Sequence, residues 1–185
     1  RDGLDGGARI GGVFHVFCLS REARNIRFED GELRFEDGEL RWREDMHNKT
    51  PNTELDHILA TEFTSGAQIT TWYVGLTAAS PTPAAADTMS SHAGWTEYTT
   101  YSQATRPAYT GVESSQAVSN TASPVTFTVN AGSTTVGGAF IVSNNTIGGS
   151  TGQLACVAAF SGGNRTPANG DQIVVTYTFG AASTN

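Results

Sequence analysis

Val125-Thr126-Phe127-Thr128-Val129 alternates apolar and polar side chains, which is the pattern of a β-strand that buries one face. Four further segments predict strands in the second half of the chain: residues 116–120, 136–142, 154–160 and 171–179. Turn-forming Asn, Gly and Ser residues separate these segments, at 130–132, 144–149, 161–164 and 168–171. Strands at this spacing are typical of an all-β, mainly antiparallel sandwich or barrel-like fold. A parallel sheet is excluded because no helix intervenes between the strands.

The stretch Trp72-Tyr73-Val74-Gly75-Leu76 divides a charged first part of the chain from a nearly uncharged second part. Its aromatic and β-branched side chains favour a short buried strand, and Gly75 would let another backbone come close. A loop rich in Pro and Ala follows over residues 77–89, and an aromatic, turn-rich stretch continues to Tyr109. We interpret the whole stretch as a packing and docking element, and we expect the exposed loop 77–94 to meet a neighbouring subunit.

Eight side chains of this stretch are candidates for contact with a partner, because aromatic residues are enriched where proteins meet. They are Trp72, Tyr73, His92, Trp95, Tyr98, Tyr101, Arg106 and Tyr109. Flat aromatic rings can also face the rings of sugars, so glycan binding is the alternative interpretation of the same cluster. Aromatic residues gathered in one region more often form core or subunit interface, and we prefer that interpretation.

The N-terminal residues 1–12 contain five glycines and little to bury, which predicts a flexible arm that orders only on a partner. Residues 12–19 then form an almost continuous apolar run with aromatic and β-branched members. Such a run predicts a strand with both faces covered, or an edge strand with one face docked. Cys18 lies in this run, and we expect its thiol and that of Cys156 to be buried and free.

A seven-residue unit occurs twice in tandem, as Arg27-Phe28-Glu29-Asp30-Gly31-Glu32-Leu33 and again over residues 34–40. Each copy contains Asp-Gly, a strong signal for a hairpin turn. The six acidic residues that surround these turns could suggest a cation site, but their spacing is not that of an EF-hand loop. We therefore interpret the repeat as a small duplication that lengthens a β-hairpin.

Residues 51–63 predict the one helix of the chain. Asn52 or Thr53 can cap it, and acidic residues fill its first turn, where the helix dipole favours them. Four apolar residues would line one face: Leu55, Ile58, Leu59 and Phe63. A short amphipathic helix of this kind can plug the side or the end of a sheet.

Length and composition indicate a single domain. A chain of 185 residues can bury one good core with an extended arm, whereas a second full domain would be tight. We expect an arm over 1–12, one β-rich domain over 13–180 and a tail over 181–185. Within the domain, residues 13–63 would form a charged hairpin and helix, and residues 69–180 the strands rich in Ser, Thr and Gly.

The charge of the chain argues against two classes of partner. Its net charge is −7 and it has only 11 Lys and Arg residues, whereas a nucleic-acid partner requires a basic face. No apolar run reaches the roughly 18 residues that a membrane-spanning helix needs. We therefore expect neither a nucleic-acid partner nor a membrane partner.

Catalytic and metal-binding interpretations find little support in the sequence. Asp87, the serines at 90–91 and His92 lie within a few residues of one another, without a nucleophile elbow or an evident oxyanion hole. His15 and Cys18 would point to opposite faces of one strand, and no second pair with ligand spacing exists. We expect a protein that is not an enzyme and that holds neither a metal ion nor another cofactor.

Three segments carry a resemblance to a known family: Trp72-Tyr73-Val74-Gly75-Leu76, Ala86-Asp87-Thr88-Met89-Ser90-Ser91-His92-Ala93-Gly94-Trp95-Thr96-Glu97, and Tyr101-Ser102-Gln103-Ala104-Thr105-Arg106-Pro107. They resemble structural proteins of tailed bacteriophages. The similarity continues through residues 138–141, 148–152 and 159–163 and through Met46-His47-Asn48, so it covers most of residues 12–180. The tandem heptads depart from the family pattern, in which a single shorter turn links the first strands.

The resemblance implies a virion component that decorates and stabilises the capsid exterior, as a cement protein does. A head-fibre or tail-associated module that binds a receptor or a glycan is the alternative. The implied partners are the major capsid protein or other virion proteins and further copies of the chain, in a homo-oligomer. The implied location is the virion, which is assembled in the cytoplasm of the bacterial host. An acidic, Lys-poor β-protein with a Gly-rich arm is suited to such a role, because strand addition can join it to its neighbours.

Overall fold

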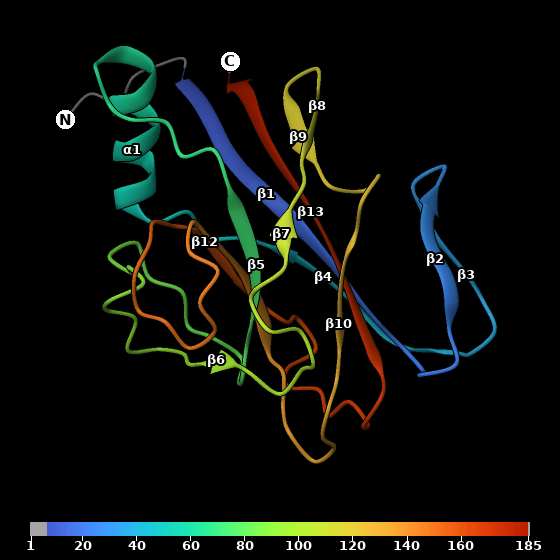
Figure 1. Ribbon diagram of the computed structural model, residues 1–185. Helices are drawn as coiled ribbons and strands as arrows, with labels where there is room; N and C mark the ends of the chain where they lie inside the picture. The colour runs from blue at the N-terminus through green and yellow to red at the C-terminus, as the bar shows by residue number, and fades with distance from the viewer. Residues whose placement is uncertain (1–6, 185) are drawn as a thin grey trace.

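The computed structural model describes residues 7–184, which form a mainly antiparallel β fold with one short helix (Figure 1). The first sheet has the strand order β4 (Leu40–His47), β1 (Gly7–Leu19), β13 (Gln172–Thr184), β9 (Ala117–Ser119) and β8 (Val112–Ser114), with β10 (Val125–Thr128) paired to β13. The second has the order β12 (Leu154–Ala159), β11 (Gly138–Val142), β5 (Trp72–Thr77) and β6 (Glu97–Tyr98), with β7 (Ala108–Tyr109) paired to β5. A hairpin of β2 (Arg24–Glu29) and β3 (Glu32–Glu36) is separate, and the helix is α1 (Asn52–Phe63).

The two larger sheets enclose one hydrophobic core. Buried side chains of both sheets meet in it, among them Phe14, Val16, Val74, Ile141 and Val175. All strand pairs are antiparallel, and no sheet closes into a barrel within residues 7–184. The five strands predicted between residues 116 and 179 are all present, as β9 to β13. The prediction of a mainly antiparallel β fold is therefore confirmed, and its barrel-like alternative is not observed within the described residues.

Strand β1 is covered on both faces, as its apolar run predicts. Phe14, Val16 and Cys18 point into the core between the sheets. Phe17 and Leu19 point the other way and pack under the β2–β3 hairpin, together with four of its apolar side chains: Ile26, Phe28, Leu33 and Phe35. The hairpin therefore shields the outer face of the first sheet, at the side of the molecule away from α1 (Figure 1).

The two ends of the chain form a ribbon that the sequence did not predict. β1 begins at Gly7 and pairs with β13 as far as Thr184, so residues 7–12 and 181–184 are strand where an arm and a tail were expected. Glycine and other small residues give no strand pattern by themselves. Residues 7–12 and 179–184 form strands because the backbone of each satisfies the hydrogen-bonding groups of the other. The rest of the predicted arm, residues 1–6, lies outside the described residues.

The two identical heptads form different turns. Asp30 and Gly31 have φ angles of 52° and 77°, the combination found in two-residue type I′ hairpins, and they join β2 to β3. Asp37 and Gly38 have similar φ angles of 54° and 67°, yet the strand that follows them leaves the hairpin. β4 pairs with β1 instead. The first copy thus supplies the turn of the β2–β3 hairpin, and the second supplies the turn, here called the corner, by which the chain passes from β3 to β4 in the first sheet.

Helix α1 differs from the predicted amphipathic helix. It begins at Asn52 with Pro51 as its N-cap, and no side chain caps it, so the predicted cap is wrong. Leu59 and Phe63 do not face the sheets but are 55% and 78% exposed. The buried residue of the helix is Glu54, an acid. No helix within residues 7–184 is long and apolar enough to cross a bilayer.

Candidate functional site

The eight predicted contact residues divide into two groups. Four are at most 5% exposed: Trp95, Tyr98, Tyr101 and Arg106. Four are half-buried: Trp72, Tyr73, His92 and Tyr109. The buried group cannot form a contact surface in this conformation, so only the second group is open to a partner.

Trp95 is buried because loop 77–94 crosses the outer face of the second sheet. Met89 of the loop and Trp95 pack there against Phe140. The His92 ring stacks on Trp95 at 3.8 Å between ring centroids, and its Nδ1 lies 2.9 Å from the Trp95 carbonyl oxygen. One side of the loop is therefore committed to packing, while the other side remains exposed.

Arg106 is buried because its guanidinium has partners on several sides. Its Nε and Nη2 donate to the two carboxylate oxygens of Glu97 at 2.8 and 2.7 Å. Its Nη1 and Nη2 also donate to the carbonyls of Asn144 and Gly149, and its charge lies 5.4 Å from the centre of the Phe140 ring. These contacts hold the loop that follows β11 against β6.

The residues of the hydrolase interpretation make separate contacts. Asp87 accepts a hydrogen bond from the backbone of Ala84 at 3.0 Å, and the Ser90 hydroxyl lies 3.1 Å from that of Thr88. His92 bonds to a backbone carbonyl, as described above. Because the three side chains are directed to different partners, the structure does not bring them together as a proton relay.

His15 and Cys18 lie on opposite faces of β1, as their spacing predicts. The His15 ring bonds to Asp45 at 2.5 Å on the solvent side, whereas Cys18 is in the core. Cys18 and Cys156 are both buried and free. Burial raises the pKa of Cys156 to about 12, so its thiol is protonated at neutral pH. Among the described residues, no three His, Cys, Asp or Glu side chains are placed to hold a metal ion.

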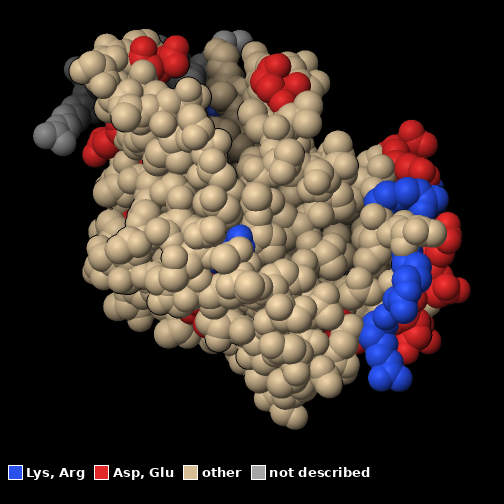
Figure 2. All heavy atoms as spheres, viewed as in Figure 1, with Lys and Arg blue, Asp and Glu red and all other residues tan. Residues whose placement is uncertain are grey.

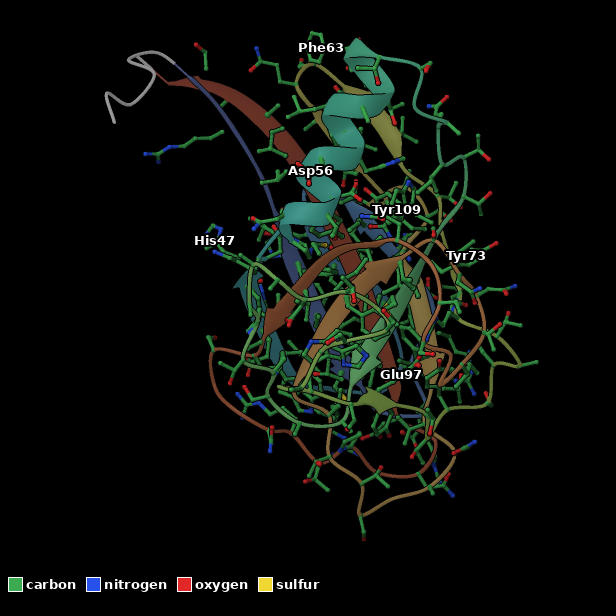
Figure 3. All side chains as sticks on the ribbon, turned by 90° about the vertical axis from the view of Figure 1, so that its left-hand side faces the viewer. His47, Asp56, Phe63, Tyr73, Glu97 and Tyr109 are labelled. Atoms are coloured by element: carbon green, nitrogen blue, oxygen red, sulfur yellow. The ribbon has the colours of Figure 1, made fainter. Side chains whose placement is uncertain are left out.

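The sequence did not predict the pocket that lies between α1 and the end of the inter-sheet core. Its volume is about 200 Å³. It is lined by side chains of α1 and six strands: Glu54, Ile58, Trp72, Tyr109, Val118, Ile141, Ala155, Tyr177 and Phe179. Trp72 and Tyr109 are two of the predicted contact residues. Figure 3 shows Tyr109 beside the helix.

Glu54 is the only charged group in the lining of this pocket. It is 5% exposed, and its Oε2 has no hydrogen-bond partner among the described residues. Burial raises the pKa of Glu54 to about 7, against a smaller lowering by hydrogen bonding from the side chain of Gln153, whose buried Nε2 has no other partner among the described residues. The sequence held one signal for this position, because Glu54 is four residues before Ile58 and therefore shares its face of the helix.

Aromatic rings make up much of the wall opposite Glu54. The rings of Tyr109 and Tyr177 meet edge to face with centroids 6.0 Å apart, and Phe179 lies 6.4 Å from Tyr177. The Tyr109 hydroxyl shares its one hydrogen between the carbonyl oxygens of Val118 and Tyr177, at 3.0 and 3.1 Å, which fixes its ring. The Tyr177 hydroxyl is buried without a partner among the described residues.

A second hollow adjoins the pocket along α1. It shares Glu54, Ile58 and Trp72 with the pocket and has a volume of about 260 Å³. Its other lining residues are His57, Thr61, Glu62, Gln68 and Ile69. The two hollows together lead from the end of the core to the side of the helix.

The same end of the molecule carries exposed apolar groups. Among the described residues, four large apolar side chains are strongly exposed: Leu40, Leu59, Phe63 and Val112. Leu59 and Phe63 lie on α1 and Val112 lies on the β8–β9 hairpin, which project at the top of Figure 1 on either side of the ends of β1 and β13. Figure 3 shows Phe63 at the tip of the helix. We call this region, with the outer end of the β1–β13 ribbon, the helix end.

Comparisons of the chain with protein-family models, with curated proteins and with solved structures found no match.

Proposed function

We propose that this chain is a structural protein of a tailed-bacteriophage virion that decorates and stabilises the capsid exterior through protein–protein contacts. The observation that carries the proposal is the helix end, where Leu59 and Phe63, four residues apart on α1, expose apolar surface on one face of the helix. Exposed large apolar side chains that cluster are characteristic of contact surfaces, whereas scattered ones are not. The resemblance of residues 72–107 to phage structural proteins supports the virion as the setting.

The ribbon at the helix end offers a second means of contact. Over residues 7–11, β1 pairs with β13 on one side, and β4 begins to pair with its other side only opposite Val13. The free edge has no strand partner among the described residues. An unpaired edge can accept a strand from another protein, which supplies affinity through main-chain hydrogen bonds.

Charge is distributed in keeping with such a role. On the face shown in Figure 2, basic and acidic groups gather over the β2–β3 hairpin, and a few acidic groups mark the helix end. The surface between them is almost free of charge. A partner on this face would displace little bound counterion, so contact would depend mainly on shape and apolar burial.

The proposal is tested with virions that lack the chain, to which purified protein is added back. Electron microscopy should show capsid density that disappears on deletion and returns on addition. A Leu59→Ser/Phe63→Ser variant should bind the particles at least about tenfold more weakly, as expected for central apolar contacts. Leu40→Ser is the matched control, because Leu40 is also exposed but lies opposite Leu19, at the other end of β1. Unchanged capsid density on deletion would refute the proposal.

A receptor- or glycan-binding module of a head fibre or tail is the second candidate. The aromatic pocket beside Trp72 favours it, because aromatic walls suit small ligands. Binding of the purified chain to host cells or to a glycan array, reduced by Trp72→Ala, would support this function. Density for the chain on the capsid, together with no such binding, would exclude it.

A further inference from the structure

Glu54 is exceptional among the buried acids of this chain. Glu97 is paired with Arg106, and Glu44 accepts hydrogen bonds from Ser161, Arg165 and the backbone of Gly162. Two other buried acids accept backbone hydrogen bonds: Asp87 from Ala84 and Asp171 from Ala168. Glu54 alone has a buried carboxylate oxygen without a partner among the described residues. A buried, unpaired carboxylate is costly, and its place in a pocket indicates that a ligand supplies the partner.

We propose that the pocket binds an organic cation, in which an alkylammonium group pairs with the carboxylate of Glu54 and lies against the rings of Trp72, Tyr109 and Tyr177. Aromatic faces attract ammonium groups through their negative ring faces, and this attraction is strongest where water is excluded. Glu54 supplies the opposite charge, and no Lys or Arg side chain lines either hollow to compete for it. Glu62 in the lining of the adjoining hollow adds a second negative group.

Other classes of ligand fit these residues less well. A sugar needs several hydrogen-bonding groups around it, whereas the pocket offers the Glu54 carboxylate and the Tyr177 hydroxyl as buried unpaired groups, and the adjoining hollow adds the Thr61 hydroxyl. A metal ion needs several ligands around it, and among the described residues no three His, Cys, Asp or Glu side chains are placed to hold one. An anion would be repelled by Glu54, and a purely apolar ligand would leave the carboxylate unpaired.

The size of the pocket suits a small ammonium compound or the end of a lysine side chain. A cavity of roughly 150 Å³ is large enough for benzene, and this pocket has about 200 Å³. The adjoining hollow leaves room for the chain that carries the ammonium group. Two sources share this chemistry: a free organic amine, and a lysine of a partner protein that sits on the helix end. The inference goes beyond the proposed function, because the pocket can be tested without a virion.

The test compares choline with 3,3-dimethylbutan-1-ol, which has nearly the same shape without the charge. Binding to the full chain is followed at pH 8 by NMR and calorimetry. Choline should bind at least about tenfold more tightly than the neutral alcohol. Glu54→Gln should remove that preference and leave the weak binding of the alcohol unchanged. Trp72→Ala should weaken the binding of both compounds. Asp56→Asn is the matched control, because Asp56 is an exposed acid of α1 that lines neither hollow.

A second arm separates the two sources of the ammonium group. An N-acetylated, C-amidated lysine peptide is compared with butylamine and with the same peptide carrying norleucine. Tighter binding of the lysine peptide than of butylamine identifies a partner's side chain, and the reverse identifies a free amine. Glu54→Gln is close in shape to the wild type, and circular dichroism checks its fold. Equal binding of choline and the alcohol, or no binding of any amine at millimolar concentration, would overturn the proposal whether or not the chain is found on a virion.

Discussion

Arg106 and Glu97 form a buried ion pair with two parallel hydrogen bonds, of 2.8 and 2.7 Å, between the guanidinium and the carboxylate. The side chain of Arg106 has no exposed surface, and that of Glu97 is 7% exposed. A backbone hydrogen bond of 2.6 Å from Gly148 to Glu97 completes the arrangement. The pair therefore connects the segment 97–106 to the loop after β11, which lies 38 to 51 residues away along the chain.

Arg106→Met should destabilise the protein strongly. It leaves the carboxylate of Glu97 buried with one hydrogen bond, and breaking a buried pair in this way costs about 3–5 kcal/mol. Urea unfolding followed by tryptophan fluorescence measures the loss. A double variant, Arg106→Met/Glu97→Met, should lose less than the sum of the two single variants, because neither charge then remains unpaired. Arg34→Met, at a half-exposed pair with Glu32, should change stability little. Equal effects of Arg106→Met and Arg34→Met would contradict the prediction.

Gly31→Ala and Gly38→Ala should differ in cost although they occupy the same position in identical heptads. Both glycines have positive φ angles, so either substitution costs about 1 kcal/mol through backbone strain. A Cβ at Gly31 meets open space, whereas one at Gly38 would lie 2.6 Å from the backbone nitrogen of Ala23 and 2.7 Å from Oγ of Ser20. Gly38→Ala should therefore cost roughly 1–3 kcal/mol more. Urea midpoints of the two variants give the comparison, and equal midpoints would show that the corner can relax.

Gly75→Ala should destabilise the second sheet by overlap with an aromatic ring. Gly75 lies opposite Phe140 in the register of β5 and β11, and a Cβ there would overlap the ring of Phe140. The sequence predicted that Gly75 lets a backbone come close, but the neighbour that needs the space is this side chain. The cost should be about 1–3 kcal/mol or more. The double variant Gly75→Ala/Phe140→Leu should lose less stability than the sum of the losses of the two single variants, because the smaller leucine leaves room for the new methyl group. A loss equal to that sum would argue against the overlap.

Local patterns in the sequence predict the strands, the first Asp-Gly hairpin and the two covered faces of β1, because period-two alternation and turn residues act within a few positions. They do not predict the ribbon, since residues 7–12 show no strand pattern without residues 179–184 beside them. They also cannot separate the two heptads, of which the second is bound to the end of β1 by hydrogen bonds between Ser20 and Glu39.

Whether a side chain of the candidate site is buried or exposed depends on its tertiary contacts, which local sequence patterns do not specify. Arg106 is polar and was expected at a surface, but Glu97 and the loop after β11 bury it. Leu59 and Phe63 are apolar and were expected inside, yet α1 meets the sheets through Glu54 and Ile58. Departures of this kind from local rules are expected at functional sites, where one requirement overrides another. The helix end and its pocket are therefore the regions that the sequence predicted least.

Glu54→Gln should stabilise the protein above pH 7 and leave it unchanged near pH 4.5. The pKa of Glu54 is raised from 4.5 to about 7 in the folded protein, so between these values the folded state binds more protons than the unfolded state. The free energy of unfolding therefore falls as pH rises through this window. At 1.36 kcal/mol per pKa unit, the wild type loses about 3 kcal/mol of stability that the glutamine variant retains.

Urea unfolding of the wild type and the Glu54→Gln variant at pH 4.5, 6 and 8 measures this difference. The difference between the two free energies of unfolding at each pH cancels the contribution of groups that titrate alike in both proteins. Glu44 is one such group, because its hydrogen bonds outweigh its burial and lower its pKa in both. Asp56→Asn controls for the change in charge on α1. Choline added at pH 8 should stabilise the wild type and leave the variant unchanged, because a ligand that pairs with Glu54 offsets the cost of its charge. A stability difference that does not change with pH would show that Glu54 finds its partner within the folded chain.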